Sequence, residues 1–292
     1  MAQTIKSLTN LTVANGEPLV WGRRTYVMGI INVTPDSFSG DGLGTDLPAI
    51  VEQALRFQEE GADFLDVGGE STRPGHEPIS VEEELQRLIP ALEAIVASAR
   101  LPVSVDTYKS EVARRALDSG AVIINDVWGL KTDPRIAELA AEAGARLILM
   151  HNQETRQYRD LLPDIFASLR HSVEQAHRAG VPRENIILDP GIGFGKTPDH
   201  NLEILDRLDE FKNLGYQTMD YPLLIGTSRK STIGLVLDLP VDQRVEGTAA
   251  TVALSIARGA DIVRVHDVKE MVRVCHMSDA IIRGWRPEGW SP

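Results

Sequence analysis

The sequence predicts an α/β fold, a (β/α)8 TIM barrel that carries a short N-terminal β-hairpin. Eight short apolar runs follow one another along the chain, and helical patterns separate them. Buried parallel strands read as apolar runs, and strands that alternate with helices form parallel sheets. Polar residues end nearly every run, and barrel enzymes carry their active sites at the carboxyl ends of the strands. We therefore expect a closed barrel with its chemistry at one end.

The apolar runs give the strands in order. We place them at residues 27–31, 63–67, 102–105, 121–124, 146–150, 185–188, 223–225 and 262–263. Periodic apolar residues place helices at 47–60, 109–119, 133–143, 163–179, 199–212, 242–258 and 267–283. A further helix follows Ser80, which has the spacing of a capping box with Glu83, and its apolar residues from Val81 to Ile95 share one face.

Residues 1–24 precede the first barrel strand, and we expect them to cover the bottom of the barrel. Asn15-Gly16 is a common two-residue hairpin turn, and apolar residues flank it on both sides. No linker, low-complexity tract or charge block divides the chain. We therefore interpret residues 1–292 as one barrel domain whose first 24 residues form a hairpin cover.

The composition is that of a globular enzyme, with 42% hydrophobic and 25% charged residues. The chain has 30 basic and 42 acidic residues, and its net charge of −12 argues against nucleic acid or an anionic membrane as a partner. No apolar stretch is long enough to span a bilayer, and the N-terminus lacks a secretion signal. Cys275 is the only cysteine, which excludes an internal disulfide. A cytoplasmic location is expected.

Asp106, Asn125 and Asp189 end three of the predicted strands. Any one of them could be a helix N-cap, a position that Asp and Asn favour. Three such residues at one barrel mouth instead favour a binding site. Two carboxylates and an amide suit a flat heterocycle with an amidine-like edge, since charge-assisted hydrogen bonds of about 1.5–3 kcal/mol each would make its recognition selective.

Arg264 and His266 alternate on the last predicted strand, so their side chains point to the same side. A cation at the end of a barrel strand needs a partner, and Arg264 together with Arg73 could hold a pyrophosphate group through bidentate hydrogen bonds. For His266, a structural pairing with Asp267 is a fair alternative, although Asp267 could also cap the last helix.

Ser228-Arg229-Lys230 follows the seventh predicted strand, where barrels often bind anions with backbone N–H groups. For Arg229 alone we prefer the interpretation of a solvated basic turn. Lys230 could instead reach inward to the proposed ring site.

The segment from Asp189 to Thr197 is rich in glycine and resembles a phosphate-binding loop only superficially. A Walker A motif needs glycine where this chain has Pro190, and the dinucleotide pattern needs a third glycine where it has Lys196. We expect a flexible loop that presents Phe194 beside a carboxylate. The histidines and Cys275 match no metal-binding motif, and no dedicated metal cluster is expected.

Several long motifs occur in one order between about Tyr26 and Gly284. They are Met28–Ser39, Gly68–Gly75, Ser104–Thr107, Asp189–Phe194, Thr227–Ser231 and Arg264–Val268. In these motifs the chain resembles the dihydropteroate synthases, the folate-pathway enzymes of bacteria and plants. The number and length of the motifs make the resemblance specific.

The resemblance implies a transferase that condenses (7,8-dihydropterin-6-yl)methyl diphosphate with 4-aminobenzoate and releases diphosphate. It also implies Mg²⁺ as a cofactor, a homodimer and a target of sulfonamides. The expected chemistry is a dissociative substitution at the pterin methylene, in which the protein positions both substrates and stabilises charge.

The resemblance also assigns residues to three binding sites. For the pterin ring they are Asp106, Asn125, Met150, Asp189 and Lys230. For the diphosphate they are Asn32, Thr72, Arg73, Arg264 and His266, with Asn32 also at the metal. For aminobenzoate they are Thr72, Arg73, Pro74, Phe194, Ser228 and Lys230.

Two alternatives remain on sequence alone. A pterin-binding methyltransferase domain would share the barrel but should lack the Ser71–Gly75 loop and the turn at Ser228–Lys230, both of which are present. A non-catalytic pterin-binding paralogue should have lost Asn32, Arg73, Lys230 or Arg264, and all four are present.

Overall fold

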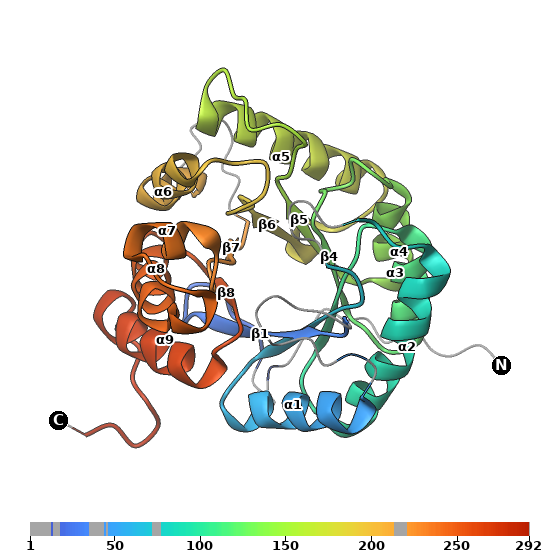
Figure 1. Ribbon diagram of the computed structural model, residues 1–292, viewed down its shortest axis with the longest axis horizontal. Coiled ribbons are helices and arrows are strands. Elements are labelled where there is room, and N and C mark those ends of the chain that lie inside the picture. The colour runs from blue at the N-terminus through green and yellow to red at the C-terminus, as the bar shows by residue number, and fades with distance from the viewer. Residues whose placement is uncertain are drawn as a thin grey trace.

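In the computed structural model, residues 13, 18–34, 44, 46–71, 77–212 and 221–291 are described. Within these ranges eight parallel strands form one sheet in the order β6-β5-β4-β3-β2-β1-β8-β7 (Figure 1). They are β1 (Tyr26–Asn32), β2 (Phe64–Gly68), β3 (Val103–Asp106), β4 (Ile123–Asp126), β5 (Arg146–Met150), β6 (Ile186–Asp189), β7 (Leu224–Ile225) and β8 (Ile262–Val265). A parallel bridge between Leu188 and Leu223 joins the two ends of this order. The predicted α/β barrel of parallel strands is therefore confirmed as a nearly closed, TIM-barrel-like sheet.

The helices surround the strands as an outer ring (Figure 1). They are α1 (Leu47–Glu59), α2 (Val81–Ser98), α3 (Ser110–Asp118), α4 (Arg135–Ala143), α5 (Leu161–Arg178), α6 (Pro198–Asp206), α7 (Ser231–Leu237), α8 (Val245–Ala257) and α9 (Val268–Ile282). Short 3-10 turns are also present. The turn η1 (Arg183–Asn185) precedes β6, η2 (Leu208–Phe211) follows α6, and η3 (Val241–Gln243) precedes α8. The sequence predicted all of the α-helices except α7. Among the described helices, none combines the length and the apolar character that crossing a membrane requires.

Side-chain caps start several helices. The Asp46 carboxylate accepts from the backbone N–H of Ala49 at α1, and the Ser80 hydroxyl accepts from that of Glu83 at α2. The predicted capping box at α2 is only half formed, because the Glu83 carboxylate pairs with Arg87 one turn further along. A complete box starts α6, where Thr197 and His200 satisfy each other's backbone N–H groups.

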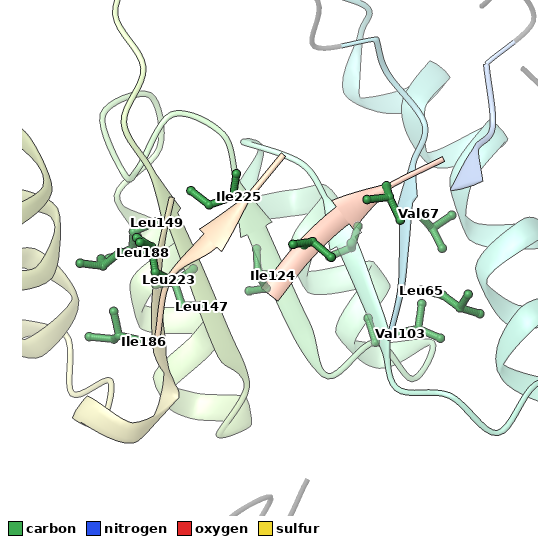
Figure 2. Packing of buried hydrophobic residues seen from close by; sticks show 14 of the residues in the cluster. Leu65, Val67, Val103, Ile124, Leu147, Leu149, Ile186, Leu188, Leu223 and Ile225 are labelled. Atoms are coloured by element: carbon green, nitrogen blue, oxygen red, sulfur yellow. The ribbon is translucent and has the colours of Figure 1, made fainter. Parts of the chain in front are cut away.

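Alternation along the strands divides the apolar residues into two cores. In β2, Phe64 belongs to a cluster inside the barrel, whereas Leu65 and Val67 belong to the cluster between the sheet and the helices. Figure 2 shows part of this outer cluster, including Leu65, Val67 and Ile124. The inner cluster comprises Val13, Tyr26, Met28, Phe64, Ile123, Ile148, Ile187, Leu224 and Ile262. Nearly all of these residues come early in their strands, so the inner cluster lies in the amino-terminal part of the barrel.

The N-terminal segment contacts this inner cluster. Val13 is buried in it, and Leu19 and Trp21 pack against it. Trp21 meets the Tyr26 ring edge-on at 5.6 Å between centroids, and the Tyr26 hydroxyl bonds to the backbone of Val20. The predicted Asn15-Gly16 turn lies outside the described residues, as does most of the predicted hairpin.

Candidate active site

Polar side chains replace apolar ones in the carboxyl-terminal half of the barrel interior. The alternation that turns Phe64, Ile123 and Ile187 inward also turns inward the residues two positions later, which are Asp66, Asn125 and Asp189. In the strand register Asp106 lies opposite Asn125, and Met150 lies opposite Asp189. The predicted pterin residues on the strands therefore share one end of the barrel.

Arg264, on β8, bonds to carboxylates on two of these strands. Its Nε donates to Asp66 Oδ2 at 2.6 Å, and its Nη2 donates to Asp106 Oδ2 at 2.8 Å. The Asn125 side-chain amide donates to the same Asp66 oxygen at 3.0 Å. We call Asp66, Asp106, Asn125 and Arg264 the arginine cluster. The partner that Arg264 was expected to need is thus supplied by two carboxylates of the chain itself.

Asp66 was missed by the sequence analysis. It lies in the middle of β2 rather than at its end, and it is completely buried. Its signal was nonetheless visible, because a single carboxylate inside an apolar strand needs a buried partner. That partner, Arg264, lies 198 positions away in the sequence.

The arginine cluster retains hydrogen-bonding capacity. Asp66 Oδ1 and Asp106 Oδ1 are buried and accept no hydrogen bond from the described part of the chain. Burial raises the pKa of Asp106 to about 7, and the charge of Arg264 opposes this rise. Burial would lower the pKa of Arg264, but the carboxylates of Asp66 and Asp106 together raise it above its ordinary value. The two acceptor oxygens suit N–H donors of a polar ring.

Lys230 follows β7, the neighbour of the strand that carries Arg264, and lies near Asp189. Its ammonium group donates to the carbonyl of Ile192 and lies 4.7 Å from the centroid of the Phe194 ring. Burial lowers the pKa of Lys230 to about 8, although the charge of Asp189 opposes the shift. Burial likewise raises the pKa of Asp189, against the charge of Lys230. Lys230 therefore reaches inward, as predicted, and meets the loop that carries Phe194.

Ser228 follows β7 and bonds to His266, which directly follows β8. Its hydroxyl accepts from the backbone N–H of His266 at 3.1 Å and bonds to His266 Nδ1 at 2.9 Å. Asp267, the rival partner for His266, instead forms a two-point ion pair with Arg229 at 2.5 and 3.0 Å. The expectation of a solvated turn at Arg229 was therefore wrong. Asp267 stands at the N-cap position of α9, but its side chain makes no capping bond.

Asn32 ends β1 and lies opposite Gly68 in the register, at the same end of the barrel. Among the described residues, no group of three His, Cys, Asp or Glu side chains could hold a metal ion by itself. Thr72, Arg73 and Pro74, predicted for the diphosphate and aminobenzoate sites, lie outside the described residues.

Comparisons with known proteins agree with this geometry. The profile of the pterin binding enzyme family matches residues 28–266. The dihydropteroate synthase of Bacillus subtilis (strain 168) is 49% identical over 282 residues, which make up 97% of this chain and 97% of that relative.

Solved structures of similar sequence share the fold. The dihydropteroate synthase of Clostridium difficile, crystallised in the presence of pteroic acid, is 47% identical, has a TM-score of 0.85 and is matched over 91% of this chain and 99% of that one. The dihydropteroate synthase of Xanthomonas albilineans with 4-aminobenzoic acid is 40% identical, has a TM-score of 0.84 and is matched over 96% of this chain and 100% of that one.

Proposed function

The chain belongs to the pterin-binding enzyme family, among its dihydropteroate synthases, and from this premise we propose how its residues serve the reaction. It is a transferase that condenses (7,8-dihydropterin-6-yl)methyl diphosphate with 4-aminobenzoate to 7,8-dihydropteroate and diphosphate. Identity of 49% over nearly the whole of both chains favours this activity over that of a methyltransferase domain.

We propose a dissociative substitution at the pterin methylene. The bond between the methylene carbon and the diphosphate oxygen breaks first, and its electron pair leaves with the diphosphate. The amine of aminobenzoate then attacks the carbon and loses a proton. The protein supplies no nucleophile in this scheme, so its residues act by positioning and by electrostatics.

The observation that carries the proposal is the set of buried carboxylates around one end of the barrel. Asp66, Asp106 and Asp189 are all buried there, and two of them retain an oxygen that accepts no hydrogen bond from the described chain. Negative charge at this depth would stabilise a cation that forms on the pterin. The same oxygens would accept from the ring N–H groups, with Asn125 and Lys230 serving its remaining polar atoms and Met150 packing on its face.

We place the diphosphate near Asn32, Arg264 and His266, with Thr72 and Arg73 contributing from the loop after β2. The two ion pairs of Arg264 use two of its five N–H groups, so a guanidinium edge could serve an anion as well. His266 would bind through Nε2, since its Nδ1 bonds to Ser228.

Mg²⁺ fits this arrangement as an ion carried by the substrate. It prefers oxygen ligands and commonly binds through substrate phosphates with only one or two protein ligands. The amide oxygen of Asn32, at the end of β1, is a ligand of that kind. When bound, the ion would supply positive charge that stabilises the departing diphosphate.

Aminobenzoate would bind against Phe194, Ser228 and Lys230, with Thr72, Arg73 and Pro74 completing its site. Because Thr72 and Arg73 also serve the diphosphate in this proposal, we expect aminobenzoate to bind after it. Calorimetry should detect aminobenzoate binding only when diphosphate or the pterin substrate is present. Tight binding to the free protein would contradict the ordered scheme.

Two measurements test the proposal as a whole. Incubation with both substrates and Mg²⁺ should release diphosphate, and a non-catalytic pterin-binding paralogue would release none. A crystal soaked with a pterin should place the ring beside Asp106, Asn125 and Asp189. A ring found elsewhere would overturn the site assignment.

We also propose a homodimer formed through the late helices. Seven of the twelve exposed large apolar side chains among the described residues lie on α7, α8 and α9: Leu235, Val236, Leu237, Leu254, Met277, Ile281 and Ile282. An apolar face of this kind commonly marks a protein interface. Sedimentation should show a dimer that Ile281→Glu weakens, whereas a monomeric wild type would contradict the proposal.

We also propose that residues 1–292 form one pterin-binding domain and that the protein acts in the cytoplasm. The continuous sheet, in which the first and last described strands β1 and β8 are paired, supports one domain. The single cysteine, Cys275, is buried, as fits a protein that relies on no disulfide.

A further inference from the structure

Lys196 is a buried lysine that the proposed reaction does not use. It follows the loop after β6 and precedes Thr197, the N-cap of α6, and only 4% of its surface is exposed. None of its hydrogen bonds within the described chain goes to a carboxylate. A buried ammonium is costly, so its retention requires an explanation.

The amine of Lys196 links two segments at the barrel mouth. Nζ lies 2.9 Å from the carbonyl oxygen of Phe194 and 2.9 Å from Nδ1 of His151, with the His151 carbonyl at 3.4 Å. His151 directly follows Met150, the last residue of β5, and Phe194 lies in the loop after β6. Lys196 therefore ties the Phe194 loop to the end of the neighbouring strand.

The protonation states follow from burial. Burial, with the nearby charges of Lys196 and Lys131, lowers the pKa of His151 to about 2, so its imidazole is neutral. A neutral imidazole has one acceptor nitrogen, and the ammonium of Lys196 requires that nitrogen to be Nδ1. The remaining proton is then on Nε2. Burial also lowers the pKa of Lys196 to about 7, in spite of Asp189.

The backbone of the loop is closely fitted to this contact. Gly191 has φ +74°, and a Cβ there would lie only 1.9 Å from the His151 carbonyl oxygen. The Phe194 N–H donates to the Gly191 carbonyl at 3.1 Å, and the Tyr158 hydroxyl donates to the Gly195 carbonyl at 2.9 Å. Two lysines hold nearby carbonyls of the same loop, Lys230 that of Ile192 and Lys196 that of Phe194.

We propose that Lys196, with His151 as its second anchor, is a positioning residue that fixes the Phe194 loop so that the Phe194 ring forms one wall of the aminobenzoate site. The proposal rests on the assignment of Phe194 to that site in the proposed function. Lys196 touches neither substrate in this scheme. It acts through the Phe194 carbonyl, whereas Lys230 contacts the Phe194 ring.

Lys196→Met tests the proposal, because it keeps the length of the side chain and removes its donors. The Michaelis constant for aminobenzoate should rise roughly tenfold, while that for the pterin diphosphate stays within about twofold. The melting temperature should not fall, since a buried charge is replaced by an apolar group. Lys212→Met is the matched control, because Lys212 ties Asp261 and Tyr221 together before β7 and β8, at the other end of the barrel.

A double-mutant cycle separates positioning from general packing. If Lys196 acts through Phe194, adding Lys196→Met to Phe194→Ala should change the aminobenzoate constant by less than about twofold. Effects that multiply in the double variant would overturn the proposal. So would a wild-type aminobenzoate constant in Lys196→Met.

Two further readouts do not depend on activity. Nitrogen-15 NMR of His151 should show the Nε2–H tautomer below the Lys196 pKa of about 7, and a change in Lys196→Met. Backbone amides of residues 191–195 should exchange faster in Lys196→Met than in Lys212→Met. A wild-type chain that releases no diphosphate would contradict the proposed function, and these two readouts would then decide the role of Lys196 by themselves.

Discussion

Two clusters at the barrel mouth bury their charges in different ways. In the arginine cluster, Arg264 pairs directly with Asp66 and Asp106. A second group, Asp189, Phe194, Lys196 and Lys230, follows β6 and β7, and we call it the lysine cluster. Both of its ammonium groups donate to backbone carbonyls. The pKa of Arg264 is raised, whereas burial lowers those of Lys230 and Lys196 to about 8 and about 7.

The difference follows from the chemistry of the two cations. A guanidinium is planar, holds its charge and fits two carboxylates at once, whereas an ammonium loses its proton more easily when buried. The arginine cluster is therefore preorganised with a fixed charge. The lysine cluster has cations whose charge changes near neutral pH, and of the two only Lys230 is proposed to contact a substrate.

The largest effect should come from the lysine cluster. Lys230→Ala should lower kcat/KM by roughly 10²–10³-fold, comparable to the loss of an oxyanion donor, because Lys230 contacts both proposed substrate sites. Steady-state kinetics on a variant that unfolds like the wild type would measure it. Near-normal turnover would remove Lys230 from the mechanism and would make the arginine cluster the main source of stabilisation.

A smaller effect is expected at Asp66. Asp66→Asn should lower kcat/KM roughly 10- to 100-fold, because Arg264 and Asn125 lose the charged acceptor that orients both of them. Asp63→Asn is a matched control, since Asp63 forms a comparable buried pair with Arg24 at 2.6 Å near the bottom of the barrel. If both variants lose only stability, the arginine cluster has no role beyond packing.

The pH profile should report Asp106 of the arginine cluster and Lys230 of the lysine cluster. Asp106, with its pKa raised to about 7, is protonated below that pH, and Lys230, with its pKa lowered to about 8, is neutral above it. The value of kcat/KM should therefore fall on both sides, by roughly tenfold for each pH unit beyond these limits. Lys230→Arg should flatten the alkaline side only. An alkaline limb that persists in this variant would contradict the assignment to Lys230.

The smallest effect on ligand binding is expected at Ser228, which belongs to neither cluster. Ser228→Ala removes the hydroxyl that holds His266 Nδ1, and the affinity for inorganic diphosphate should fall roughly 2- to 10-fold. Calorimetric titration would measure the change. Ser255→Ala, which removes a hydroxyl bonded to Thr251 within α8, should leave diphosphate binding unchanged.

Much of the fold and part of the site followed from simple periodicity. Apolar runs located the strands, and because the carboxyl ends of parallel barrel strands meet at one mouth, the polar residues that end them had to share that end. This placed Asp106, Asn125 and Asp189 together. Ion pairs between distant segments could not be predicted from periodicity. The partner of Arg229 is Asp267, 38 residues along the chain, and no local pattern distinguishes that pair from a solvated turn.

Helix α7 was missed for a physical reason. It has only seven residues, and Leu235, Val236 and Leu237 are exposed on it while Thr232 and Ile233 are buried. An amphipathic helix is recognised by its polar outer face, and α7 lacks one. The same apolar surface that hid the helix supports the proposed dimer.

The barrel closes between β6 and β7 through little hydrogen bonding. β7 has two residues, and the Leu188–Leu223 bridge is accompanied by a bond from the Leu188 N–H to Pro222 at 2.9 Å. Asp189 lies at the end of β6, and Lys230 follows β7. A ligand that contacts both Asp189 and Lys230 would bridge β6 and β7, so bound substrate would stabilise a junction that has few hydrogen bonds among the described residues. In the unliganded protein, we expect local opening to occur between β6 and β7 rather than between the well-paired strands.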